Sequence, residues 1–198
     1  NFINVVLDPQ FRNAVLDTIR YVAVALGLTF LAPIVLAIML NEIPWFKQSY
    51  RMVFFLPQVC SSVVIMLLWK QMFDSSSRGY LNKIVLAVGH GLGANPQPID
   101  WLGSSFWAPI CVVLPVLWAS VGMGSLIYLA ALKSVSDDIY EAADLDGAGL
   151  FQKIAHITIP TLGPLIVINF VGAFIGTFQQ LQNIFVMTGG SSGTRVLS

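Results

Sequence analysis

The chain has 198 residues, of which 56% are hydrophobic and only 10% are charged, and its formal net charge is zero. Soluble domains usually carry about 25% charged residues, so this composition leaves too few charges to cover a water-exposed surface. No run of basic residues alternates with aromatic residues, which excludes a nucleic-acid partner. We therefore expect an all-α membrane protein whose helices contact lipid.

The predicted elements are membrane-spanning helices, each of which needs about 20 apolar residues to cross a hydrocarbon core about 30 Å thick. Four segments meet this requirement, and we predict spans over residues 19–40, 52–73, 106–132 and 161–187. Residues 1–198 then form a single transmembrane domain, a polytopic helical bundle. The chain begins with Asn1 rather than methionine, so we expect a piece of a longer protein.

Four crossings divide the connecting segments into two sets on opposite sides of the membrane. Segments 41–51 and 133–160 share one side, whereas the N-terminal stretch, segment 74–105 and the tail share the other. Within segment 74–105, the apolar spacing of residues 80–88 predicts a short amphipathic helix. Lys and Arg are normally enriched on the cytoplasmic side. The first side carries Lys47, Arg51, Lys133 and Lys153, and the second carries Arg12, Arg20, Lys70, Arg78, Lys83 and Arg195, so the count leaves the orientation undecided.

Chemistry-bearing residues are sparse. Cys60 and Cys111 both lie in apolar stretches, and we expect small buried side chains at both positions. Neither these cysteines nor His90 and His156 show the spacing of metal ligands, so no metal site is predicted. The chain also lacks the phosphate-binding sequence G-x-x-x-x-G-K-[ST] and any recognisable catalytic arrangement around a histidine. We expect neither enzymatic activity nor a bound cofactor in this chain.

The polar segment 133–160 is predicted to fold as helix, turn and helix. Asp138 and Glu141 resemble a capping box, with Ser136 and Asp137 as alternative caps. Gly147 can adopt a positive φ and so permits a tight turn after Asp146. The small pair Ala142 and Ala143 would let another surface approach the first helix closely, with Glu141 and Asp146 as charges at its rim. An apolar stripe follows at Leu150, Phe151, Ile154 and Ile157. The residues alone leave two interpretations open, a docking element or a solvated acidic loop.

The spacing within this segment resembles the EAA motif of permease subunits of binding-protein-dependent ABC importers. The matching residues are Glu141-Ala142-Ala143, Asp146-Gly147-Ala148, Phe151, Ile157, Pro160 and Pro164. Weaker similarity to sugar-type permeases of the maltose and glycerol phosphate branch extends along almost the whole chain. It is carried by residues 8–13, 51–57, 101–103 and 188–190.

This resemblance implies a multi-pass permease in a bacterial or archaeal cytoplasmic (inner) membrane. Segment 133–160 would be the cytoplasmic coupling loop, which docks onto an ATPase, and the first and last spans would be missing from this chain. The implied partners are two ATP-binding cassette subunits that bind ATP and magnesium, a second permease of different sequence, and an extracytoplasmic solute-binding protein. The implied solute is a sugar or sugar derivative. The alternatives are an importer of amino acids, peptides or phosphate, and a passive channel or membrane scaffold.

A stripe of polar and small residues on the fourth span is the candidate substrate path. It comprises Asn169, Gly172, Gly176, Gln179 and Asn183, at spacings of three and four residues. Such a stripe either faces a wet cavity or packs against another helix, since Gly172 and Gly176 also form a GxxxG motif. In the family the helices on either side of the coupling loop line the path, which favours Gly176 and Gln179.

The matching stripe on the third span comprises Ala119, Ser120 and Met123, beside Trp118. The Trp118 ring could stack on a sugar or simply pack against a helix. On the second span, Gln58, Ser61 and Ser62 are interpreted as interhelical hydrogen-bonding residues.

Overall fold

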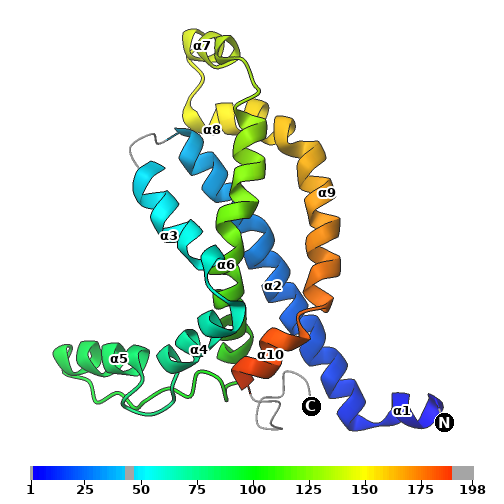
Figure 1. Ribbon diagram of the computed structural model, residues 1–198, viewed down its shortest axis with the longest axis vertical. Coiled ribbons are helices and arrows are strands. Elements are labelled where there is room, and N and C mark those ends of the chain that lie inside the picture. Colours follow the sequence, from blue (N-terminus) through cyan, green and yellow to red (C-terminus); the bar gives the residue numbers. More distant parts are fainter. Residues whose placement is uncertain (1, 43–46, 189–198) are drawn as a thin grey trace.

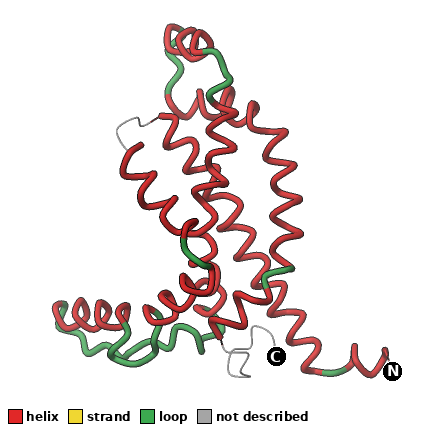
Figure 2. The backbone as a smooth tube through the Cα atoms, viewed as in Figure 1, coloured by secondary structure: helices red, strands yellow, loops and turns green. Residues whose placement is uncertain are grey.

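The computed structural model describes residues 2–42 and 47–188, whose regular secondary structure is entirely helical (Figure 1; Figure 2). Three segments are long and apolar enough to cross a membrane: α2 (Pro9–Glu42), α6 (Trp107–Leu132), and the continuous run of α8 (Leu150–Lys153), η2 (Ile154–Thr158) and α9 (Ile159–Phe178). Both α6 and α9 pack against α2. The predicted all-α membrane bundle is confirmed.

The start of α2 follows from local chemistry. Pro9 occupies the first helical position, where a backbone N–H would have no partner in the helix. Asp8 Oδ1 accepts a hydrogen bond from the Gln10 backbone N–H at 2.9 Å and so caps the helix. With 34 residues, α2 is about 50 Å long, which exceeds the hydrocarbon thickness of about 30 Å. The charged N-terminal turns of α2 therefore extend beyond the apolar layer, where α1 (Phe2–Leu7) bends away (Figure 1).

The second predicted span, 52–73, differs from the structure because it is divided into α3 (Lys47–Val59) and α4 (Ser62–Met72). Pro57 cannot donate a backbone hydrogen bond, and Cys60 N–H bonds to the Pro57 carbonyl in a tight turn at 3.1 Å. Ser61 then adopts an extended conformation (φ −62°, ψ 136°) before α4 starts. Cys60 lies exposed at this break, contrary to the expected burial, whereas Cys111 is buried in α6.

The fourth predicted span, 161–187, is also interrupted. After α9 ends at Phe178 the chain turns at Gln179 and Gln180, and α10 (Leu181–Thr188) follows. The Gln179 N–H bonds to the Gly176 carbonyl at 3.1 Å, which tightens the end of α9. Consequently α10 packs against α4 and α6 instead of continuing the axis of α9 (Figure 1).

Two apolar clusters hold the bundle together, one towards each end. Near α10, residues of α2, α4, α6 and α10 meet around Val112, Val113 and Met187. Near α7 (Asp137–Leu145), the second cluster joins α2, α6 and α9 through Ile34, Ala37, Tyr128, Leu132 and Leu162. Between the clusters α9 separates from α6, and this separation leaves space within the bundle.

The polar segments lie at opposite ends of the molecule. At one end, α7 projects beyond the spans (Figure 1). At the other end, α5 (Tyr80–Gly91), the amphipathic helix predicted within segment 74–105, lies across the direction of the spans (Figure 1). Several residues named in the sequence analysis lie outside the described part of the chain, namely Gly189, Gly190 and Arg195.

Candidate functional site

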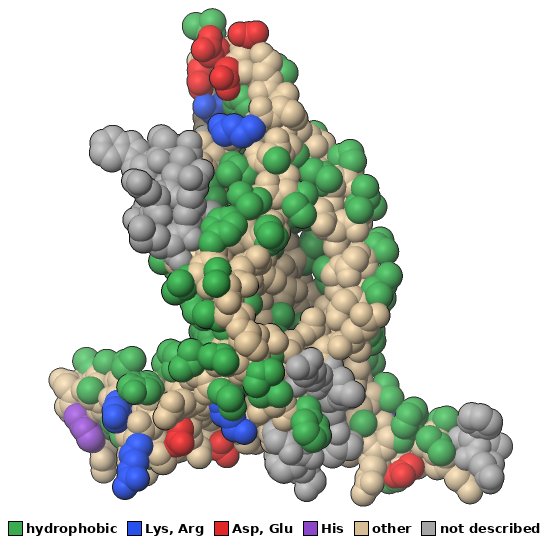
Figure 3. Space-filling model, viewed as in Figure 1, with side chains coloured by type: hydrophobic (Ala, Val, Ile, Leu, Met, Phe, Trp, Pro, Cys, Tyr) green, Lys and Arg blue, Asp and Glu red, His purple; other side chains and the backbone are tan. Residues whose placement is uncertain are grey.

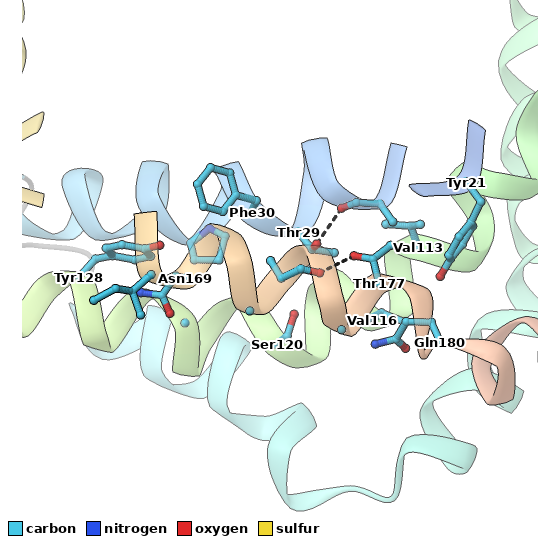
Figure 4. A pocket seen from close by; sticks show the side chains of 17 residues that line it. Tyr21, Thr29, Phe30, Val113, Val116, Ser120, Tyr128, Asn169, Thr177 and Gln180 are labelled. Carbon is cyan, nitrogen blue, oxygen red and sulfur yellow. Dashed lines mark hydrogen bonds between the residues drawn. The ribbon is translucent and has the colours of Figure 1, made fainter. Parts of the chain in front are cut away.

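A cavity of about 490 Å³ lies between α2, α6 and α9, in the stretch that separates the two apolar clusters. The molecular surface is hollowed between these helices (Figure 3). Most of the cavity wall is apolar. Its polar side chains are Thr29 from α2, Ser120 from α6, Asn169 and Thr177 from α9, and Gln180 from the following turn (Figure 4).

Gly172 and Gly176 both line this cavity. Apart from the adjoining backbone of α9 and the residues next to each glycine, no described residue has an atom within 4 Å of the position that a Cβ would occupy at either glycine. A GxxxG motif used for packing would instead bring a neighbouring backbone against these positions. Within this chain, the small residues of α9 therefore widen the cavity, and they do not seat another helix.

The polar side chains of the wall can accept hydrogen bonds. The Thr29 hydroxyl donates to the Ala25 carbonyl, and the Thr177 hydroxyl donates to the Ala173 carbonyl, each at 2.7 Å (Figure 4). The Asn169 amide donates to the Leu165 carbonyl at 2.9 Å. Because both hydroxyl donors and one of the two amide hydrogens of Asn169 are satisfied within their own helices, the side-chain oxygens remain acceptors towards the cavity. Aromatic rings of Tyr21, Phe30 and Tyr128 complete the wall.

The other predicted path residues lie on different surfaces. Trp118 packs against Trp69, with ring centroids 6.2 Å apart, which agrees with the packing interpretation. The Ala119 carbonyl accepts a hydrogen bond from Gln58 Nε2 at 3.2 Å and so faces α3. Met123 is 51% exposed and lies off the cavity wall. Gln179 lies in the turn after α9, and its neighbour Gln180 reaches the cavity instead. Of the predicted residues, Ser120, Asn169, Gly172 and Gly176 thus line the cavity.

Sequence reasoning missed the contribution of α2 to this wall. Tyr21, Ala25, Thr29 and Pro33 recur at intervals of four residues and form the face of α2 that borders the cavity. The presence of Thr29 and Pro33 at this spacing in the charge-free part of the helix, residues 21–41, was the available signal.

The N-terminus of α7 is capped by Ser136, whose hydroxyl oxygen accepts a hydrogen bond from the Asp138 N–H at 3.3 Å. Of the caps expected from the sequence, the Ser136 alternative is therefore confirmed, and the capping box of Asp138 and Glu141 is wrong. Ser136 has the extended backbone that a capping residue needs (φ −62°, ψ 135°), whereas Asp138 already lies within the helix.

The C-terminus of α7 explains the spacing of the second half of the motif. Gly147 has φ +76°. Its N–H bonds to the Asp144 carbonyl at 3.1 Å, and the Ala148 N–H bonds to the Ala143 carbonyl at 2.9 Å. This pair of bonds is a Schellman motif, which requires a left-handed residue after the helix. Gly147 therefore sets the angle at which the chain leaves α7.

Two side-chain contacts hold α7 against the helix that follows it. Lys153 Nζ forms an ion pair with Asp144 Oδ1 at 2.7 Å, and the hydroxyls of Tyr140 and Thr158 lie 3.4 Å apart. Since α8, η2 and α9 form one continuous helical segment, these contacts connect α7 with a wall of the cavity.

The outer surface of the 133–160 segment is unusually apolar for a projecting loop. Leu145 is 90% exposed and Phe151 is 85% exposed. Glu141, Ala142, Asp146 and Gly147 are also exposed, while Ala143 and Ala148 are half-buried. Acidic side chains gather at the tip, with basic side chains beneath them (Figure 3). Large exposed apolar side chains next to charges are typical of a surface that binds another protein.

No group of three or more His, Cys, Asp or Glu side chains within residues 2–42 and 47–188 is placed to hold a metal ion. The candidate site has two parts, the cavity inside the bundle and the projecting surface of segment 133–160 that is connected to it.

Comparison with known proteins agrees with this arrangement. Residues 29–196 match the family described as binding-protein-dependent transport system inner membrane component. The chain is 34% identical to the lactose transport system permease protein LacF of Rhizobium radiobacter over 195 residues, which are 98% of this chain and 63% of that protein. It is 30% identical to the arabinooligosaccharides transport system permease protein AraP of Bacillus subtilis over 181 residues, 91% of this chain and 56% of that protein.

The fold is similar to that of a bacterial ABC transporter involved in the import of the acidic polysaccharide alginate. The TM-score is 0.84 at 26% sequence identity, and the match covers 99% of this chain and 67% of that chain. The same transporter type has been solved with an alginate pentasaccharide-bound periplasmic protein, with a TM-score of 0.83. The chain belongs to the family of binding-protein-dependent transport system inner membrane components.

Proposed function

We propose that this chain is a permease subunit of an ATP-driven importer and that a sugar or sugar derivative crosses the membrane through the cavity. Two ATP-binding cassette subunits would bind ATP and magnesium, and a second, different permease and an extracytoplasmic binding protein would complete the assembly. The named solutes of the relatives, lactose, arabinooligosaccharides and alginate, support a carbohydrate. The membrane would be the cytoplasmic membrane of a bacterium or archaeon.

The observation that carries this proposal is the connection between the projecting α7 and the cavity. Helix α6 leads into α7 through the short segment 133–136, and α7 is held on the segment that continues into α9. Both α6 and α9 line the cavity. A partner that displaces α7 therefore moves two walls of the cavity together, which is what an ATP-driven change of access requires.

The exposed residues of the 133–160 segment suit an ATPase groove. Leu145 and Phe151 would be buried by the partner, and Glu141 and Asp146 would lie at the rim of the contact. This sequence contains no G-x-x-x-x-G-K-[ST] motif, and in this proposal ATP hydrolysis occurs on the partner subunit.

The cavity wall suits a sugar. The oxygens of Thr29, Asn169 and Thr177 accept hydrogen bonds from hydroxyl groups, and the rings of Tyr21 and Phe30 can contact the apolar faces of a pyranose. A wall with few charges also avoids the strong binding that would slow release of a transported solute.

Gly147→Val tests the docking role. Valine at φ +76° costs about 1–2 kcal/mol or more, so the substitution distorts the end of α7 while the spans stay unchanged. Gly149→Val is the matched control, because Gly149 has an ordinary extended backbone (φ −71°, ψ 166°). In proteoliposomes that contain the whole importer, we expect Gly147→Val to lower uptake per ATP hydrolysed, with normal membrane insertion, and Gly149→Val to behave like the wild type. Unchanged coupling in Gly147→Val would refute the docking role.

The nature of the solute is tested separately by solute-stimulated ATPase activity. Carbohydrates carried by a matching binding protein should stimulate hydrolysis, whereas stimulation by amino acids, peptides or phosphate would point to the other importer classes. Copurification without any ATPase subunit would favour a passive channel or scaffold.

A further inference from the structure

Helix α5 carries an apolar surface that the rest of the described chain does not cover. Tyr80, Ile84 and Val88 are each more than half exposed, and Leu92, directly after the helix, is 81% exposed. They recur at intervals of four residues, and with the half-buried Val85 they span about 140° of the helix circumference at 3.6 residues per turn. We call these five residues the apolar arc of α5; Leu81 instead packs against the apolar cluster near α10.

The rotation of α5 about its axis is set by contacts on a different face. Asn82 is fully buried, and its Nδ2 donates to the carbonyls of Asp74 and Ile99, each at 3.0 Å. Its Oδ1 accepts from the Ile99 N–H at 2.9 Å and from Trp101 Nε1 at 3.1 Å. A Cβ at Gly89 would lie 2.3 Å from Pro96 Cγ, so the glycine lets segment 92–100 pack closely against α5. These contacts leave the apolar arc facing away from that segment.

The depth of α5 along the bundle is set by the same hydrogen bonds. Trp101, which donates to Asn82, packs edge to face on Trp107 with ring centroids 5.4 Å apart. Trp107 packs in the same way on Phe106, with ring centroids 5.1 Å apart. Phe106 is 68% exposed at the start of the apolar helix α6. Exposed aromatic residues at the end of a span mark the boundary between hydrocarbon and headgroups. Helix α5 therefore lies at the level of this boundary, across the direction of the spans (Figure 1).

The basic side chains of α5 lie away from its apolar arc, as expected for a helix that lies in a membrane surface. Lys83 projects about 130° and His90 about 150° from the centre of the apolar arc. Lys83 Nζ lies 5.3 Å from the Tyr80 ring centroid, at the edge of the arc. Over α5, hydrophobic side chains gather on the side towards the spans, and the basic and histidine side chains lie on the opposite side (Figure 3).

We infer that α5 is an interfacial helix whose apolar arc inserts into the lipid leaflet at the end of the bundle opposite α7. The acyl chains next to the headgroups cover Ile84 and Val88, and Lys83 reaches into the headgroup layer. This placement holds segment 74–101 at a fixed depth relative to the membrane, at the end of the bundle opposite α7. It depends on membrane insertion alone, so it stands or fails independently of the transported solute and of the ATPase partner.

Depth-dependent fluorescence quenching tests this placement in the full-length protein assembled in lipid nanodiscs. Cys60 and Cys111 are replaced, and a single cysteine at Ile84 or Lys83 carries an environment-sensitive fluorophore. A nitroxide on the lipid acyl chain should quench the label at position 84 several-fold more strongly than aqueous iodide does, and the label at position 83 should show the reverse preference. Equal iodide quenching at the two positions would overturn the inference. Protection of position 84 from both quenchers would also overturn it, since a protein partner would then cover the arc.

A second measurement needs no substitution. A photoactivatable lipid in the same nanodiscs should form adducts on Ile84 and Val88, detected by mass spectrometry. Val167 and Val171 of α9, which are 64% and 53% exposed and lie off the cavity wall, are the positive control for lipid contact. Adducts on α9 without adducts on α5 would overturn the placement.

Discussion

The close contact between α3 and α6 at Gly122 predicts that Gly122→Ala destabilises the protein. A Cβ at Gly122 would lie 2.4 Å from the Phe54 carbonyl oxygen and 3.0 Å from its carbonyl carbon. Ordinary contact begins at 3.4 Å, so α3 has to move by about 1 Å to admit a methyl group, since backbone atoms cannot rotate away as a side chain can. This movement also strains the hydrogen bond from Gln58 to the Ala119 carbonyl on the same interface.

The size of the effect follows from three contributions. Overpacking of this kind costs about 1–3 kcal/mol, and loss of the Gln58 hydrogen bond costs about 1 kcal/mol. Replacing glycine by alanine within a helix stabilises the folded state by about 1 kcal/mol, which offsets part of this cost. The net expectation is a destabilisation of about 1–3 kcal/mol, which for a chain of this length corresponds to a Tm lowered by about 2–12 °C.

Thermal unfolding of the purified protein, followed by loss of the monodisperse chromatographic peak after heating, measures this change. Gly27→Ala is the matched control on α2, because the described structure has no atom within 4 Å of the added Cβ there. Its Tm should stay the same or rise slightly. A Tm for Gly122→Ala that equals or exceeds that of Gly27→Ala would refute the close packing of α3 on α6.

Two further predictions concern the segment beside α5 and the cavity. Asn82→Ala leaves the carbonyls of Asp74 and Ile99 without their side-chain donor, which costs at least about 2 kcal/mol of local stability. Limited proteolysis should therefore cut segment 74–101 several-fold faster in this variant. The control is the exposed neighbour Lys83→Ala, in which the segment should be cut at the wild-type rate. Cleavage at equal rates would contradict the role of Asn82. Gly176→Leu projects a bulky side chain into the cavity, so it should abolish uptake while the basal ATPase activity of the importer persists. Gly163→Leu is the control and should retain uptake, because Gly163 has similar free space but lies off the cavity wall. Wild-type uptake in Gly176→Leu would show that solute does not pass this point.

The elements that depend on long apolar runs were predictable from the sequence. The charge-free stretch around residues 106–132 gives α6 almost at its predicted limits, since hydropathy summed over a whole span tolerates errors at single positions. The turn at Gly147 was also predictable, because only glycine readily adopts the positive φ that a Schellman motif needs. Helix ends were harder, because the sequence left Ser136, Asp137 and Asp138 as alternative caps of α7 and only the structure identifies Ser136.

The interruptions of the second and fourth apolar runs were decided by tertiary structure. Ser61 and Gln179 lie within sequences apolar enough to continue a helix, and the summed hydropathy does not change when one or two residues leave helical geometry. Pro57 removes one helical hydrogen bond near the first break. In the interrupted arrangement α4 and α10 pack around Val112 and Val113 of α6, and burial of this apolar surface favours the breaks.

The composition and the spacing within residues 133–160 together determined the membrane class, the family resemblance and the projecting helical loop. Only the tertiary structure decided which residues face the cavity. Asn169, Gly172, Gly176 and Ser120 do so, while Trp118 packs on Trp69. Helix α2 supplies a wall that no motif indicated. The physical reason is that sequence spacing defines which residues share a helix face, but the rotation of each helix, set by distant contacts, determines what that face meets.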